Sequence, residues 1–275
     1  MISALKTLPA WIKVSVYFII LWLGTLLAGT VTILNDFSFF LAIAVLVAMA
    51  FTGSLPQATI GCGFFPQRRQ HLIQFAAGLA CGICMLLVTA FITFLLTGDS
   101  WQFNHHPSLP VILLTFAFCL WSAFVQEAVF RGFPFQVMLQ RYAPWIAQLA
   151  IAIPFGLMHV KQGMSGQEIF TTMLCTGMGS LLFGLAYIRT RNLMLPIGLH
   201  CGWNYAQALI PRTQPGSTPD RLVIVSGDVA DYNFLNVIAP YLLVVSLAIV
   251  LLLFMGRNLR QPHPSTVTHP FRARP

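Results

Sequence analysis

A carboxylate and a guanidinium lie in a segment that otherwise reads as membrane helix. Glu127 is the only acidic residue between Asp99 and Glu168, and Arg131 follows it by four residues. Two residues at this spacing share one face of a helix, so the arginine can pair with the carboxylate and reduce the cost of burying it. Because ionisable groups inside bilayer helices are costly and usually functional, Glu127 is the first candidate for chemistry.

Three further polar side chains fall in apolar segments. His159 follows Phe155 by four residues, and His200 and Asn204 are again four apart, so each pair projects to one side of a helix. A single buried histidine is usually structural. Together with Glu127, however, these side chains form a set suited to hydrolysis, in which a carboxylate takes a proton from water and imidazole or amide groups stabilise an oxyanion.

The same side chains leave metal binding open. Glu127, His159 and His200 are candidate ligands for a divalent ion such as zinc, and no other cofactor is indicated. No acid is placed for a Ser-His-Asp triad, and the sequence H-E-x-x-H does not occur. The common soluble-hydrolase and zinc-protease signatures therefore do not apply.

The composition places these residues in a polytopic membrane protein. Of the 275 residues, 57% are hydrophobic and 8% are charged, and the mean hydropathy is +0.78. This leaves too little polar surface to cover a soluble globule. The net charge of +8 follows the pattern of membrane orientation, and no basic cluster is interleaved with aromatic residues, so nucleic acid is not expected as a partner.

Apolar windows long enough to cross a bilayer, about 20 residues, recur along the chain. They predict an all-α polytopic helix bundle with about eight transmembrane helices. The bundle forms a single domain over residues 1–256, and a basic, Pro-rich, disordered tail follows over residues 257–275. The expected spans are about residues 11–34, 37–55, 72–96, 110–131 or further, 144–161, 168–188, 194–210 and 235–256.

The basic residues set the expected orientation. With the N-terminus inside, 12 lysines and arginines lie at inner loops or inner helix ends, and only 3 lie on outer segments. Short loops rich in these residues stay on the cytoplasmic side, so we expect both termini to be cytoplasmic. The three outer basic residues are Lys161, Arg212 and Arg221.

A helical hairpin would bring two of the candidate residues to one depth. Glu127 lies 16 residues before Ala143 and His159 lies 16 after it, so a turn near Ala143-Pro144 places both about 24 Å from the turn at 1.5 Å per residue. The fourth helix must then continue through Gly132, with a kink at Pro134. Small residues at helical spacing, Gly78-x3-Gly82 and Ser180-x3-Gly184, predict helix contacts.

Three motifs resemble those of the CAAX-protease and bacteriocin-processing (CPBP) family of intramembrane proteases, which includes type II CAAX prenyl endopeptidases and abortive-infection proteins. They are E-x-x-x-R-G at Glu127–Gly132, F-x-x-x-H at Phe155–His159 and H-x-x-x-N at His200–Asn204. The resemblance covers about residues 110–210. It implies an eight-helix intramembrane endopeptidase whose glutamate activates water, while His159, His200 and Asn204 hold the water or the oxyanion. It also implies a peptide or membrane-protein substrate, and we expect a bacterial cytoplasmic membrane.

The chain departs from the family pattern at Gln126. The family motif usually begins with two glutamates, and the first, which is its expected base, is replaced here by an amide that cannot take up a proton. One hypothesis makes Glu127 the base, with Arg131 as its orienting partner. A second makes the protein a catalytically silent relative that acts in membrane binding or immunity, and a third makes it a transporter that uses the same polar groups as ligands or a proton relay.

Overall fold

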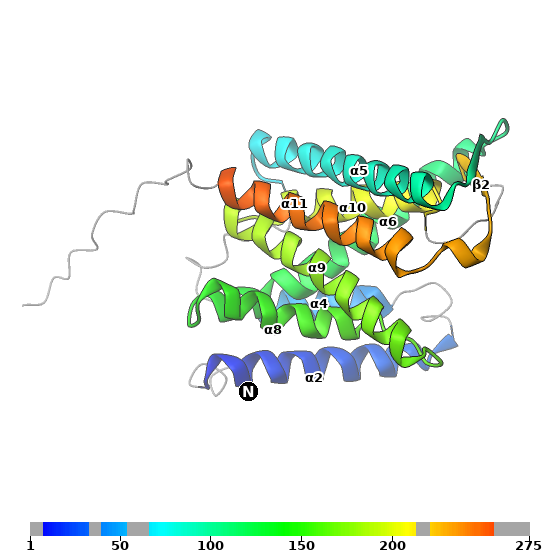
Figure 1. The fold of residues 1–275 in the computed structure, drawn as a ribbon. Helices are drawn as coiled ribbons and strands as arrows, with labels where there is room; N and C mark the ends of the chain where they lie inside the picture. Colours follow the sequence, from blue (N-terminus) through cyan, green and yellow to red (C-terminus); the bar gives the residue numbers. More distant parts are fainter. Residues whose placement is uncertain (1–7, 33–39, 54–65, 213–220, 256–275) are drawn as a thin grey trace, which may run out of the picture.

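The computed structural model describes residues 8–32, 40–53, 66–212 and 221–255, and it is predominantly helical (Figure 1). The helix α2 lies along one side of the bundle and α5 along the opposite side, with the remaining helices between them. The helices are α2 (Ala10–Gly29), α4 (Phe40–Gly53), α5 (Arg69–Thr97), α6 (Leu109–Arg131), α7 (Phe133–Leu139), α8 (Pro144–Leu157), α9 (Gly166–Thr190), α10 (Met194–Leu209) and α11 (Ala239–Met255).

Shorter elements connect these helices at one end of the bundle. The strands β1 (Ser100–Phe103) and β2 (Val223–Ser226) pair antiparallel, with Ser100 opposite Ser226. A 3-10 turn, η2 (Val229–Asp231), follows β2, and a π-helical turn, η3 (Phe234–Ile238), leads directly into α11. Near this end the Tyr232 hydroxyl donates to the buried Asp99 carboxylate, so the segment before α11 is tied to the end of α5.

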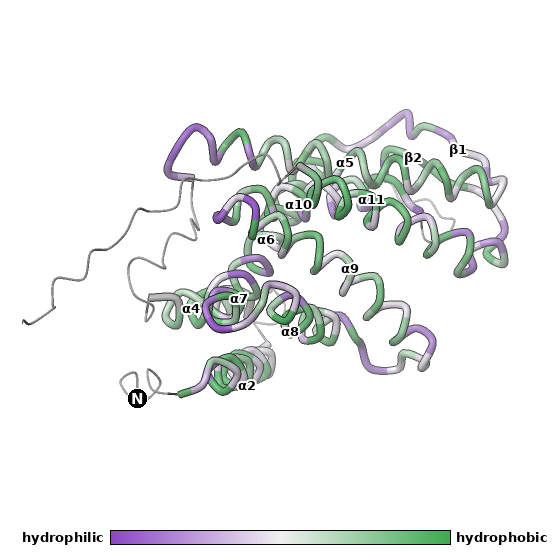
Figure 2. The backbone as a smooth tube through the Cα atoms, turned by 60° about the vertical axis from the view of Figure 1, so that its left-hand side comes forward, coloured by the Kyte–Doolittle hydropathy of each residue, from purple (hydrophilic) through white to green (hydrophobic). Residues whose placement is uncertain are grey.

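The described residues contain five helical segments that are long and apolar enough to cross a membrane. Figure 2 shows hydrophobic residues over most of the length of these helices. Many of their large apolar side chains are exposed, as those of bilayer-facing residues are. The chain is an integral membrane protein. The count of about eight spans and the cytoplasmic termini remain predictions, and the predicted tail over residues 257–275 lies outside the described residues.

The expected continuation of the fourth helix is present but interrupted. The break lies at Gly132, and α7 continues to Leu139, giving an apolar segment of 31 residues. Pro134 has no backbone N–H to donate to the Phe130 carbonyl. The ladder of backbone hydrogen bonds in the helix is therefore interrupted before the proline itself. The kink expected at Pro134 therefore falls two residues earlier.

The expected fifth span, residues 144–161, was too long, because α8 ends at Leu157. His159 lies in the turn that follows, with its backbone N–H on the Gly156 carbonyl at 3.0 Å. The chain then bends through Gly163, whose φ of +89° is accessible mainly to glycine. His159 is thus held at a helix end rather than inside a helix.

Glycines allow α10 to pack directly on α5. A Cβ atom at Gly78 or Gly82 would lie 2.5 or 2.3 Å from a carbonyl oxygen of α10. On α10, a Cβ at Gly198 or Gly202 would lie 2.2 Å from a carbonyl oxygen of α5. Backbones this close exclude any side chain, which is the small-x3-small packing of membrane helices. The predicted contact at Gly78-x3-Gly82 is confirmed, and it fixes the helix that carries His200 and Asn204.

Candidate active site

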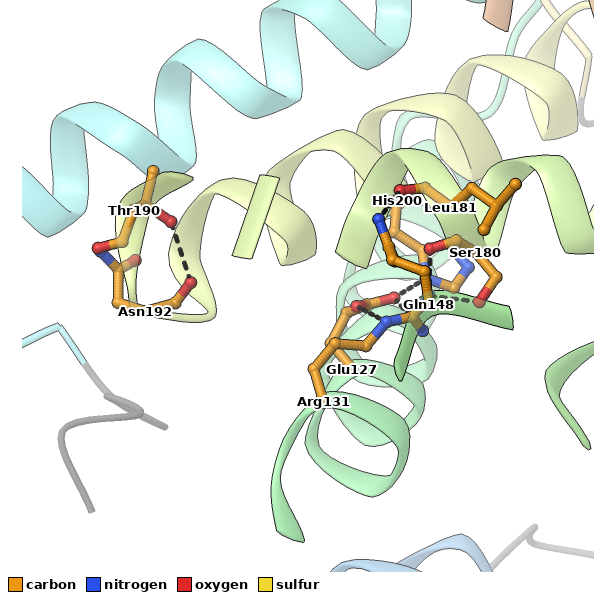
Figure 3. Close-up of polar contacts among 8 residues, drawn as sticks. All are labelled: Glu127, Arg131, Gln148, Ser180, Leu181, Thr190, Asn192 and His200. Carbon is orange, nitrogen blue, oxygen red and sulfur yellow. Dashed lines mark hydrogen bonds and ion pairs between the residues drawn. The ribbon is translucent and has the colours of Figure 1, made fainter. Parts of the chain in front are cut away.

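Glu127 lies at the centre of a buried ionic network that joins α6, α9 and α10 (Figure 3). One of its carboxylate oxygens is 2.9 Å from Nδ1 of His200, and the other is 3.4 Å from Nε of Arg131. The Arg131 Nη2 group donates to both the carbonyl and the hydroxyl of Ser180, at 2.8 and 2.7 Å. Glu127 and Arg131 are both 0% exposed, so the predicted i,i+4 pair exists and is fully buried.

Aromatic rings enclose the charged groups. The Arg131 guanidinium lies 4.7 Å from the centre of the Phe155 ring and 5.6 Å from that of Phe183, within the range of cation–π attraction. Phe183 also stacks on His200, with ring centres 4.7 Å apart and planes 14° apart. The His200 ring is therefore fixed on one face by Phe183 and at one nitrogen by Glu127.

The Nδ1 atom of each histidine faces a hydrogen-bond acceptor. The His159 Nδ1 atom lies 2.8 Å from the Phe155 carbonyl oxygen, which can only accept. At His200 the partner of Nδ1 is the Glu127 carboxylate. These contacts favour the tautomer with its proton on Nδ1, in which the neutral ring presents the lone pair of Nε2. This arrangement suits both residues to accept a proton or to bind an electrophile.

His159, His200 and Asn204 line one cavity with a volume of about 230 Å³. Within the described residues no hydrogen-bond partner occupies the Asn204 amide, so it remains available to a ligand there. Neither Gln126 nor Glu127 is among the residues that line this cavity. Three of the predicted site residues thus line the same cavity. Glu127 does not line it and contacts His200, which does.

Residues 107–206 match the family model described as type II CAAX prenyl endopeptidase Rce1-like. No curated protein sequence matches the chain. The Rce1-like segment contains every residue of the three motifs, so the resemblance drawn from those motifs is confirmed over this part of the chain. A match to this family indicates a membrane protease whose substrate is a peptide or protein.

Gln126 turns toward a different neighbour in the Rce1-like segment. Its Nε2 donates to the Ser122 hydroxyl at 3.1 Å, and its Oε1 is buried without a hydrogen-bond partner in the described part of the chain. The side chain therefore neither contacts His200 nor reaches the cavity lining. The side chains at positions 126 and 127 have different neighbours, because consecutive residues on a helix point about 100° apart.

Several contacts of the site were not predicted from sequence. Ser180 was expected only as a packing residue, yet it accepts two hydrogen bonds from Arg131. Phe183, one turn further along α9, was not predicted at all, although an aromatic residue spaced three from Ser180 shares its helix face. The cavity also extends to Arg212 and Tyr241, which lie outside the Rce1-like segment.

The donor set around the cavity does not match a catalytic zinc site. Such sites use three protein ligands from His, Cys, Asp or Glu. Across the described ranges no group of three such residues could hold a metal ion. Of the candidate ligands, Glu127 is engaged by His200 and Arg131, which leaves the two histidines. Cys175 also lines the cavity but forms no such group with them. The residues present therefore do not fit a catalytic zinc ion.

Proposed function

We propose that the chain is an intramembrane endopeptidase of the CAAX-protease and bacteriocin-processing type, which hydrolyses a peptide bond with a water molecule held in the cavity. The observation that carries the proposal is the 2.9 Å contact between Glu127 and Nδ1 of His200, which leaves the Nε2 of a cavity-lining histidine ready to accept a proton. The substrate is a peptide or a membrane protein that reaches the cavity from the bilayer.

In this mechanism His200 is the general base. Its Nε2 takes a proton from water as the water oxygen bonds to the carbonyl carbon, and the carbonyl oxygen becomes an oxyanion. The buried Glu127 carboxylate holds the ring and stabilises the imidazolium, as the acid of a catalytic triad does. Glu127 is then a positioning residue rather than the base expected from sequence, because its oxygens face His200 and Arg131.

Asn204 and His159 complete the reaction. The Asn204 amide donates a hydrogen bond to the oxyanion, and the His159 Nε2 accepts the second hydrogen of the attacking water. When the intermediate collapses, the C–N bond breaks and the imidazolium of His200 gives its proton to the leaving nitrogen. Arg131 offsets the charge of Glu127 throughout.

The first test measures hydrolysis by the purified protein in detergent micelles. The substrate is a fluorogenic peptide with an S-farnesyl cysteine followed by three residues, after the prenyl endopeptidase description of the matching family. Changing His200 or His159 to Ala should lower kcat about 100- to 10,000-fold, and Asn204→Ala should lower it about 100- to 1,000-fold. His106→Ala, a substitution of an exposed histidine, is the matched control. Turnover that survives loss of both cavity histidines would refute the proposal.

One observation favours a second candidate, a catalytically silent membrane protein that binds a peptide or a partner. Gln126 occupies the position of the first glutamate in the family pattern, and within the described ranges its side chain hydrogen-bonds to Ser122 alone. Gln126→Glu distinguishes the two functions. Hydrolysis that is present in the unmodified protein and lost in His200→Ala supports the peptidase. Hydrolysis that appears only in Gln126→Glu supports the silent protein. We expect either function to be exercised in a bacterial cytoplasmic membrane.

A further inference from the structure

A second cation, Arg212, lines the cavity in addition to the catalytic candidates. It follows the end of α10 and is only 7% exposed. Its Nε is 3.4 Å from Oε1 of Gln207 and its Nη1 is 3.4 Å from the Val237 carbonyl, both at the long limit for a hydrogen bond. Its guanidinium lies 5.3 Å from the ring centres of both Trp203 and Tyr241.

Among the residues that the structure describes, no acid pairs with this buried charge. The ion pairs formed by the described residues all involve Glu127, and none includes Arg212. Arg131 differs in this respect, because its charge is matched by a carboxylate at 3.4 Å. Burying an unpaired cation is unfavourable, and two aromatic faces offset only part of that cost. An anionic ligand in the cavity would supply the missing charge.

Arg212 and His200 both line the cavity, and their contacts lie at different positions along α10 and α9. On α10, the Gln207 contact of Arg212 lies seven residues beyond His200, which is about 10 Å along the axis. On α9, Phe183 stacks on His200, and Cys175 accepts a hydrogen bond from Tyr241 beside Arg212. These two α9 residues are eight apart, or about 12 Å. The Trp203 ring, which Arg212 also contacts, belongs to a residue only three positions beyond His200, or about 4.5 Å along the axis. The contacts of Arg212 therefore lie about 5–12 Å from His200 along the helices.

This separation corresponds to a short stretch of extended peptide. A chain that spans about 3.3–3.6 Å per residue covers about 5–12 Å with about two or three residues. A peptide whose scissile bond lies at His200 would therefore place the second or third residue after that bond beside Arg212. A guanidinium binds a planar carboxylate through two parallel hydrogen bonds, which no neutral group in a peptide can match.

We propose that Arg212 binds a carboxylate of the peptide substrate about two or three residues beyond the scissile bond. The group is the free carboxylate of the peptide's C-terminus or an acidic side chain at that position. Arg212 is then a specificity residue rather than a catalytic one, since it lies away from the reacting atoms. The proposal rests on the proposed peptidase function, and it assigns a role to a residue outside the Rce1-like segment.

Three peptides test this site by hydrolysis. They are the prenylated peptide with a free C-terminus, its C-terminal carboxamide, and the carboxamide with Glu as its last residue. In the unmodified protein the carboxamide should have a KM about 10- to 100-fold higher than the free acid. In Arg212→Gln the ratio of the two KM values should fall to about 1. Arg221→Gln, the same charge change on the outer segment and away from the cavity lining, should keep the original ratio.

The ratio of the two KM values distinguishes recognition of the carboxylate by Arg212 from an effect of Arg212 on the stability of the protein. A purely structural role for Arg212 would weaken hydrolysis of both peptides alike and leave their KM ratio unchanged in Arg212→Gln. That result, or equal KM values in the unmodified protein, would overturn the proposal. Recovery of the low KM by the peptide that ends in Glu would identify a side-chain carboxylate as sufficient, and no recovery would identify the C-terminal carboxylate.

A binding assay keeps the proposal independent of turnover. Fluorescein-labelled forms of the acid and carboxamide peptides are titrated with His200→Ala and with His200→Ala/Arg212→Gln, and anisotropy is followed. The carboxylate site is supported if His200→Ala binds the acid more tightly than the carboxamide and His200→Ala/Arg212→Gln does not. This result does not require that any peptide is hydrolysed. Equal binding of the two peptides by His200→Ala would reject the site even if the peptidase activity is real.

Discussion

Replacing Arg131 with Met should lower the free energy of unfolding by about 3–5 kcal/mol, because it leaves a buried carboxylate without its cation. Arg131 and Glu127 are both 0% exposed, so water cannot replace the guanidinium. The substitution also removes the two hydrogen bonds to Ser180, at 2.7 and 2.8 Å. Methionine replaces the apolar stem of arginine but not the guanidinium, so the loss combines the missing charge with a cavity.

A double substitution separates the charge from the packing. In Arg131→Met/Glu127→Gln the remaining amide is neutral and costs less to bury than an unpaired carboxylate. We therefore expect the double variant to be more stable than Arg131→Met alone, with a coupling energy of about 1–3 kcal/mol.

Unfolding is followed by tryptophan fluorescence in mixed micelles as the fraction of denaturing detergent rises. Arg141→Met, which changes an exposed arginine, is the control and should change stability by less than about 0.5 kcal/mol. If the two substitutions instead destabilise additively, Glu127 and Arg131 do not depend on each other and the network is not an ionic pair.

Three further predictions use the same unfolding assay. Gly82→Ala places a Cβ 2.3 Å from the α10 backbone and should cost about 1–3 kcal/mol, whereas Gly29→Ala, with nothing within 4 Å, should not destabilise. Ser180→Ala removes the 2.7 Å hydroxyl acceptor but keeps the carbonyl, so it should cost about 1–3 kcal/mol. Burial and the hydrogen bond to Asp99 raise the pKa of Tyr232, so stability should fall as pH rises above about 10, where the unfolded tyrosine ionises. Tyr232→Phe should reduce that slope, and an unchanged slope would contradict the assignment.

The helices were predictable where local signals define them. The predicted spans 72–96, 168–188 and 194–210 correspond to α5, α9 and α10, which extend over residues 69–97, 166–190 and 194–209. Hydropathy and capping decide these boundaries, and Ser165 with Glu168 forms a complete capping box at the start of α9. The early end of α8 was not predictable in this way. It precedes a turn through Gly163, whose φ of +89° is a backbone conformation that hydropathy does not signal.

The candidate site was predictable only in part. Helix periodicity was sufficient to pair Glu127 with Arg131, since that contact lies within one helix. The contacts of Glu127 with His200 and of Arg131 with Ser180 join residues 73 and 49 positions apart. They follow from the close packing of α10 on α5 and from the position of α9, which no periodicity encodes. For the same reason the sequence could not indicate that Glu127 lies behind His200 rather than in the cavity.

The ionic network also constrains what a carboxylate at position 126 can do. Glu127 is already matched by Arg131 and His200, so a second carboxylate one residue earlier would find no cation among the described contacts of Gln126. Gln126→Glu buries an additional charge beside Ser122 and should lower stability by about 1–3 kcal/mol. Any gain in hydrolysis should therefore come with a loss of stability, measured on one preparation by turnover and by unfolding. A gain in hydrolysis at unchanged stability would mean that the new carboxylate has turned into the cavity, where Arg212 or a histidine compensates it.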